Sequence, residues 1–269
     1  MGNDMQAIRV LKRGLMIKLK QLGEIDFSKN MPENGYVLDK NKNVTGLCLY
    51  KTGICDLSLL AKLQNLNQLN LSSNQISNLY DLAGLKNLNQ LDLNSNRISD
   101  LTALAGLQNL KQLYLWNNQI SNLSPLAKLE NLNLLNLWYN KISDLSPLIR
   151  LKNLKQLDLR VNKISELPPE ILDLNLEIEW EDLSVEKGIN LYGNPLEKPP
   201  VEIVKQGRDA VVEYFKSLEG GKLPLNEVKV LLVGDGGAGK TSLMKRLIGK
   251  GFDINEKQTF CVKFKLNLI

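Results

Sequence analysis

Leucines recur along most of this chain in a frame that returns every 22 residues. The frame reads Leu66-x-x-Leu69-x-Leu71-x-x-Asn74-x-Ile76, and it starts again at Leu88, Leu110, Leu132 and Leu154. An earlier copy begins at Val44 with Thr52 in the asparagine slot, and a last copy runs from Ile189 to Asn194. A fixed period of this length predicts a solenoid of stacked units, and about seven units can be counted.

The frame also predicts the structure of each unit. In Leu69-Asn70-Leu71 the alternation of apolar and polar residues indicates a short strand whose leucines point inward, and strands of successive units should pair in parallel. The asparagine follows the strand where the chain must bend, and its amide can satisfy buried backbone groups. The stretch 121–126 and its relatives should form the return. No unit can bury its leucines alone, so stability must come from stacking.

These residues resemble the leucine-rich-repeat family over roughly residues 44–196. The resemblance implies a curved solenoid whose concave strand face binds another protein. Trp116 and Trp138 occupy the same strand slot in adjacent units, so they should lie about 5 Å apart. With Tyr114 and Tyr139 they would form an exposed aromatic cluster, the composition favoured at binding hot spots. The alternative is that these four aromatics only pack on one another across the strands.

A second motif lies near the other end of the sequence. The apolar stretch 227–233 predicts a strand, residues 242–248 read as a helix, and Gly-x-x-x-x-Gly-Lys-Thr, a P-loop or Walker A motif, lies between them. Its backbone N–H groups would bind a phosphate at the helix N-terminus. Lys240 would reach the β- and γ-phosphates, and the Thr241 hydroxyl would ligate Mg²⁺. The predicted phosphate-binding residues are Gly234, Asp235, Gly236, Gly237, Ala238, Gly239, Lys240, Thr241 and Ser242.

Composition narrows the chemistry further. The chain has no histidine, which removes histidine-based catalysis and histidine metal sites. Its three cysteines have no metal or redox spacing, so a reducing cytoplasmic setting is expected. The net charge of +5 is too small and scattered for a nucleic-acid interface, and no apolar stretch is long enough to span a membrane. We therefore expect neither nucleic acid nor membrane as a partner.

The order of repeats, linker and P-loop resembles the Roco proteins, truncated early in their Ras-like Roc GTPase domain. The resemblance implies GTP or GDP with Mg²⁺ as ligands, and it matches Thr259 to the switch threonine that senses Mg²⁺. Cys261 stands where relatives have glycine, and the guanine-recognition and second metal-site motifs do not occur in these residues. We therefore name no catalytic residue and do not expect this chain alone to hydrolyse GTP.

The expected fold is α/β, with a leucine-rich-repeat solenoid followed by a partial P-loop domain. We assign residues 1–43 to an N-terminal cap, 44–196 to the solenoid, 197–223 to a linker helix that begins after Pro200, and 224–269 to the P-loop part. Two alternatives to a guanine-nucleotide-binding repeat protein remain at this stage. One is an interaction module with a non-functional P-loop remnant, and the other is an ATP-binding repeat protein.

Overall fold

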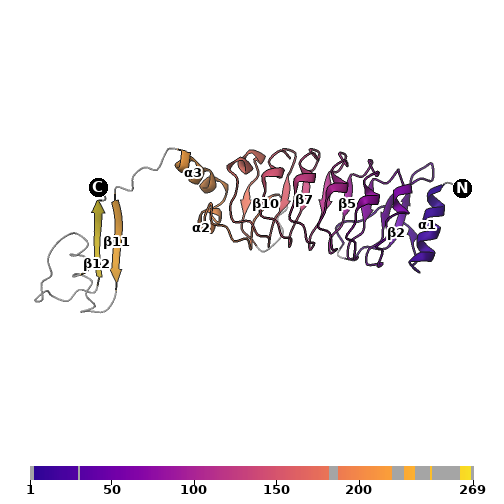
Figure 1. The fold of residues 1–269 in the computed structure, drawn as a ribbon, viewed down its shortest axis with the longest axis horizontal. Helices are drawn as coiled ribbons and strands as arrows, with labels where there is room; N and C mark the ends of the chain where they lie inside the picture. The colour runs from indigo at the N-terminus through magenta and orange to yellow at the C-terminus, as the bar shows by residue number, and fades with distance from the viewer. Residues whose placement is uncertain are drawn as a thin grey trace, which may run out of the picture. The chain divides into compact units, whose positions relative to one another are not determined.

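The structure, a computed structural model, describes residues 3–29, 31–181, 187–219, 227–233, 243 and 261–267. The chain divides into two compact units, Met1–Phe215 and Lys216–Ile269. The first unit contains a single sheet of short strands, which follow one another in chain order as far as β8 (Figure 1). In spatial order the strands are β1 (Lys20–Gln21), β2 (Gly35–Leu38), β3 (Val44–Cys48), β4 (Gln68–Asn70), β5 (Gln90–Asp92), β6 (Gln112–Tyr114), β7 (Leu134–Asn136), β8 (Gln156–Asp158), β10 (Gly188–Asn190) and β9 (Ile178–Glu179).

The register of this sheet is constant from β4 to β8. Leu69 lies opposite Leu91, Leu91 opposite Leu113, and the same pairing continues through β7 and β8. These leucines are fully buried, because each points away from the concave face into the interior of the solenoid. Only β2 and β3 pair antiparallel; every other pair in this sheet is parallel. The predicted solenoid of parallel strands is confirmed.

Short 3₁₀ turns return the chain on the opposite side of each unit. A backbone N–H near the start of the turn donates a hydrogen bond to a side-chain oxygen two residues earlier. The Ser124 N–H, for example, donates to Asn122 Oδ1 at 2.9 Å. The apolar side chains of the turns are buried, so each turn closes the interior beneath its strand. The turns are η1 (Leu60–Lys62), η2 (Tyr80–Leu82), η3 (Thr102–Leu104), η4 (Ser124–Leu126), η5 (Ser146–Leu148) and η6 (Pro169–Leu174).

The frame asparagines form a second periodic feature, the asparagine ladder (Asn74, Asn96, Asn118, Asn140, Asn162 and Asn194). Asn118 represents the group: its Nδ2 donates to the carbonyl oxygens of Leu93 at 3.0 Å and Leu115 at 3.1 Å. Its Oδ1 accepts the Ile98 N–H at 3.0 Å. Each asparagine thus joins its own unit to the preceding one, because it satisfies buried backbone groups in both.

The two ends of the first unit carry additional elements. Helix α1 (Asn3–Gly14) buries Ile8 and Leu11 against the first unit of the solenoid. At the other end, α2 (Val201–Val204) and α3 (Arg208–Glu219) replace the single linker helix that the sequence predicted. The helix is interrupted because Gly207 adopts a φ of +90°, a left-handed conformation that a continuous helix does not contain.

The second unit contains the predicted strand at 227–233, here β11 (Glu227–Val233). It pairs antiparallel with β12 (Cys261–Asn267), so that Glu227 lies opposite Asn267 and Val233 opposite Cys261. The predicted phosphate-binding residues 234–242 and Thr259 lie outside the described residues. In the part of the chain that the structure does describe, no helix is long and apolar enough to cross a membrane.

Candidate functional site

Three flat side chains stack along the concave face of the sheet. The rings of Trp116 and Trp138 have centroids 5.1 Å apart and an interplanar angle of 21°. The guanidinium of Arg160 lies over the other face of Trp138, 4.2 Å from its ring centroid. We call these three residues the concave stack. They follow β6, β7 and β8 at intervals of 22 residues, so the spacing of the repeats brings them together.

Arg160 is fixed in this position by Asp158. Alternate residues along an extended strand share a face, so both side chains reach the concave side. The Arg160 guanidinium donates from Nε to Asp158 Oδ1 at 3.0 Å and from Nη2 to Oδ2 at 2.7 Å. Both side chains are at most 5% exposed. The ion pair holds the flat face of the Arg160 guanidinium against Trp138, and the Asp158 carboxylate balances the positive charge of the guanidinium.

One polar atom of the concave stack has no partner. Trp138 Nε1 is buried, and the described residues offer it no hydrogen-bond acceptor. A buried N–H without an acceptor is unfavourable by about 1–3 kcal/mol. An acceptor supplied by a bound molecule would remove that penalty. The Trp138 N–H is therefore an unsatisfied donor within the concave stack.

The four predicted aromatic residues are not equally accessible. Tyr139 is 55% exposed, whereas Tyr114, Trp116 and Trp138 are half-buried. The expectation that all four are exposed was wrong for Tyr114, Trp116 and Trp138. The Phe27 ring stacks on Tyr114 with centroids 6.1 Å apart. Sequence reasoning missed Arg160, although continuing the Trp116–Trp138 interval by one unit would have found it. It also missed Phe27, which carries no periodic signal.

Charge distinguishes the repeats that carry the concave stack. Residues 108–163 contain eight Lys or Arg and only three Asp or Glu, a net charge of +5 that equals the net charge of the whole chain. Lys141 and Lys163, which follow two of the ladder asparagines, are exposed. A partner that meets this region is favoured if it carries negative charge, because complementary charge accelerates and orients association.

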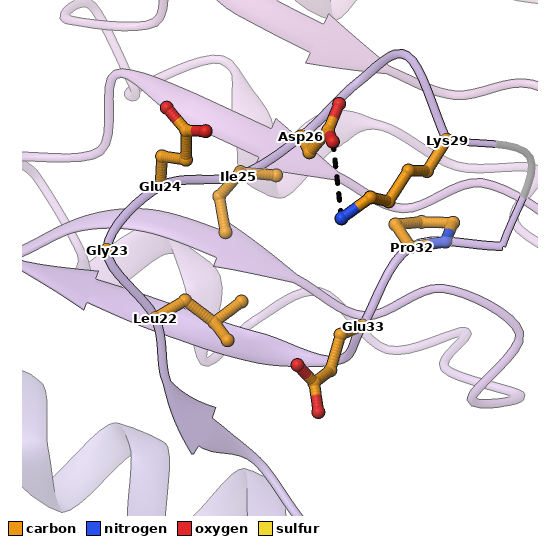
Figure 2. A pocket seen from close by; sticks show the side chains of 8 residues that line it. All are labelled: Leu22, Gly23, Glu24, Ile25, Asp26, Lys29, Pro32 and Glu33. Atoms are coloured by element: carbon orange, nitrogen blue, oxygen red, sulfur yellow. Dashed lines mark ion pairs between the residues drawn. The ribbon is translucent and has the colours of Figure 1, made fainter.

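The segment between β1 and β2 encloses a hollow of about 210 Å³, shown in Figure 2. Its carboxylates do not converge: Glu24 and Glu33 point away from each other, and Asp26 pairs with Lys29 at 3.3 Å. Within the described ranges, no three His, Cys, Asp or Glu side chains come close enough to hold a metal ion. We therefore do not assign this hollow as a metal site.

A buried carboxylate lies further along the concave face, on β5. Asp92 is 7% exposed, and burial raises its pKa to about 6 from an ordinary value of 3.8, although hydrogen bonds from Asn94 and Ser72 lower it. Asn70 Nδ2 donates to Asp92 Oδ2 at 3.3 Å. Asn70 and Asn136 occupy the equivalent slot on β4 and β7, so the solenoid already accepts an amide there.

We expect Asp92→Asn to stabilise the protein at pH 7 by up to about 3 kcal/mol. The folded state holds the Asp92 proton more tightly than the unfolded state, so the parent loses stability as the pH rises from about 4 through about 6. Urea unfolding at pH 4 and pH 7 measures the effect. The gain should be small at pH 4 and near its maximum at pH 7, and an equal gain at both pH values would contradict the assignment.

Comparisons with known proteins agree with the architecture. The model of leucine rich repeats (2 copies) matches residues 64–106, 86–128, 108–150 and 130–174. The model of "Ras of Complex, Roc, domain of DAPkinase" matches residues 229–269. A search of the curated proteins finds no match to the chain.

Solved structures with a similar fold include two internalins of Listeria monocytogenes. Internalin C2 is 34% identical, with 57% of this chain and 73% of that chain covered and a TM-score of 0.48. An internalin (inlF) is 24% identical, with 70% and 58% covered and a TM-score of 0.50. Pollen Receptor Kinase 3 is 23% identical, with 73% and 97% covered and a TM-score of 0.51. Together with the family models, the ten-stranded sheet shows that the chain is a leucine-rich-repeat protein in which a Roc segment follows the repeats.

Proposed function

We propose that the solenoid is a protein-binding module whose partner docks on the concave stack. The observation that carries this proposal is the buried, unpartnered Nε1 of Trp138 between Trp116 and the paired guanidinium of Arg160. Tryptophan, tyrosine and arginine are the residue types that dominate binding energy at protein interfaces. Tyr139, which follows Trp138 directly, adds an exposed aromatic side chain to the same surface.

The chemistry of this surface limits the kind of partner that it fits. A flat stack of two indoles and a guanidinium favours an extended segment with a planar or apolar side chain. The Trp138 N–H requires an acceptor, which a backbone carbonyl or a carboxylate supplies. The net positive charge of residues 108–163 favours an acidic segment. The proposed partner is therefore a protein that presents an acidic, extended segment.

Selection of a displayed random peptide library on the immobilised protein tests this proposal. Enriched peptides should be acidic and should bind Trp138→Ala about tenfold or more weakly than the parent, because a hot-spot side chain is lost. Trp138→Phe keeps a stacked aromatic ring but removes the N–H together with part of the indole, so it should lose part of the affinity. Tyr80→Ala is the matched control, since Tyr80 is a 78% exposed aromatic on the turn η2. Enriched peptides that bind Trp138→Ala as tightly as the parent would refute the proposal.

We also propose that the Roc segment binds GTP or GDP with Mg²⁺. The match of residues 229–269 to the Roc model and the Gly-x-x-x-x-Gly-Lys-Thr sequence within it support this second function. In this proposal the backbone of residues 234–242 holds the phosphates, Lys240 reaches the β- and γ-phosphates, and Thr241 ligates Mg²⁺. Thr259 is a further proposed Mg²⁺-sensing residue. The proposal covers binding and includes no hydrolysis step.

Titration of the purified chain with a fluorescent GDP analogue in the presence of Mg²⁺ tests the nucleotide proposal. Binding should saturate, and Lys240→Ala should weaken it about tenfold or more, because a charge-assisted hydrogen bond to phosphate is removed. Trp138→Ala, in the solenoid, should leave GDP affinity unchanged. The absence of saturable binding would leave the interaction module with a P-loop remnant, and tighter binding of ATP than GTP would favour the ATP-binding alternative.

A further inference from the structure

Residues 22–34 connect two strands that are parallel neighbours, β1 and β2, with residue 30 outside the described residues. We call this connection the strap. Strands that run parallel require the chain to cross back over one face of the sheet, a path usually taken by a helix. The strap has no helix or strand of its own, and it takes this path as an irregular segment (Figure 2).

Two apolar side chains of the strap show that it crosses the concave face. Ile25 is 4% exposed and lies over Gly46 of β3, where an added Cβ would meet Ile25 Cγ1 at 3.0 Å. Phe27 stacks on Tyr114 of β6. These two contacts lie three strands apart, so the strap extends from the first repeat to the edge of the concave stack. Asp26 holds the turn around Phe27 by accepting the N–H of Ser28 at 2.9 Å.

One concave slot is buried from β3 to β5, although its side chains are polar, whereas Gln68 and Gln90 in the neighbouring slot are half-buried. Cys48, Asn70 and Asp92 share one slot of the register and are 0%, 1% and 7% exposed. In the same slot, Asn136 of β7 is half-buried, whereas Asp158 of β8 and Asn190 of β10 are 2% and 0% exposed. The strap residue Asn34 lies over the start of this row, with its Oδ1 3.8 Å from Cys48 Sγ and its Nδ2 donating to the Tyr50 carbonyl at 2.9 Å.

The attachment of the strap is weak compared with the packing of the repeats. Apart from the buried Pro32, its other side chains are mainly charged or exposed; Glu24, Lys29 and Glu33 are exposed, and Met31 is 80% exposed. The repeats, by contrast, are joined by continuous rows of fully buried leucines and by the asparagine ladder. Segments with few buried apolar contacts open locally at a lower free energy than the core around them.

We propose that the strap is a built-in occupant of the concave face, and that it opens as a unit to extend the partner-binding surface from the concave stack to Cys48. This inference rests on the proposed partner-binding function and adds its regulation. In the closed state the partner reaches only the stack and Tyr139. In the open state Tyr114 loses Phe27, and an aromatic side chain of the partner takes its place. The strap thus competes with the partner for Tyr114.

Cys48 reports this opening directly, because its thiol is buried in the closed state. In a Cys55→Ser, Cys261→Ser background it is the single thiol of the chain. Phe27→Ala should raise the rate of Cys48 modification by a thiol reagent about tenfold or more, because the aromatic stack that closes the strap is lost. Tyr139→Ala is the control, since it removes an aromatic from the same face outside the strap, and it should leave the rate unchanged.

The thermal midpoint of each variant, measured by circular dichroism, separates local opening from unfolding. A faster rate of Cys48 modification, with a thermal midpoint close to that of the parent, would support opening of the strap without unfolding of the solenoid. A rate of Cys48 modification in Phe27→Ala within twofold of the parent rate would overturn the proposal. A faster rate that is fully explained by a lowered thermal midpoint would also overturn it. Because the assay uses no partner, its failure would leave the peptide-selection result untouched. Failure of that selection would likewise not change the labelling result.

Discussion

Asn118→Ala should destabilise the solenoid by about 2–4 kcal/mol. The substitution removes Oδ1, the acceptor of the buried Ile98 N–H. It also removes one of the two amide donors at each of the Leu93 and Leu115 carbonyls. The unsatisfied Ile98 N–H is unfavourable by about 1–3 kcal/mol, and the hydrogen bonds lost at the two carbonyls add to this cost. Since Leu93 and Ile98 belong to the preceding unit, the loss falls on the interface between repeats, which provides most of the stability of a solenoid.

Equilibrium unfolding in urea measures this loss. Asn109→Ala is the matched control, because Asn109 donates a single hydrogen bond to the Lys86 carbonyl at 2.8 Å on the exposed side of the unit. Its substitution should cost much less, since water can replace the lost donor. If both variants lost similar amounts of stability, the asparagine ladder would not have the role that its geometry indicates.

Arg160→Ala should be comparably severe, at about 3–5 kcal/mol. It leaves the Asp158 carboxylate, 2% exposed, without the guanidinium that balances its charge. It also removes the cation from the face of Trp138. The larger part of the loss should come from the uncompensated carboxylate, because removing one member of a buried ion pair costs more than the pair itself contributes.

The double variant Asp158→Asn, Arg160→Met separates these contributions. Asparagine already occupies the equivalent slot in Asn136 and Asn190, and methionine retains much of the volume of the arginine stem. We expect the double variant to recover most of the stability that Arg160→Ala loses, as measured by urea unfolding. If the double variant were as unstable as the single one, the ion pair itself would be stabilising beyond the cost of burying it.

The solenoid could be predicted because the same leucine frame recurs every 22 residues and each copy of it contains one strand. The slot of each leucine in the frame determines which leucines meet, so the pairing of Leu69 with Leu91 follows from the sequence alone. The role of the frame asparagine followed from its two donors and one acceptor. The conformation of the residue before it could not be predicted: Tyr139 and Val161 have φ values of +55° and +51°. Valine avoids this region, so the stacked neighbours must impose it.

The candidate site was only partly predictable, for a similar reason. Contacts along the repeat axis, such as Trp116 with Trp138, have a fixed sequence interval and can be read from the register. The contact of Phe27 with Tyr114 joins an irregular segment to a distant repeat, and no periodicity indicates it. The break between α2 and α3 was missed because the apolar spacing of a helix continues across Gly207, whereas its backbone conformation does not.

The outer strands of the ten-stranded sheet bear on how the molecule avoids aggregation. Both β1 and β9 have only two residues, and they include the charged side chains of Lys20 and Glu179. An exposed sheet edge recruits further strands when it is long and apolar, and these two edges are neither. The interior strands β4 to β8 are nearly interchangeable, whereas the two edges are not. Repeats can therefore be gained or lost between them without creating a surface on which copies of the protein would polymerise.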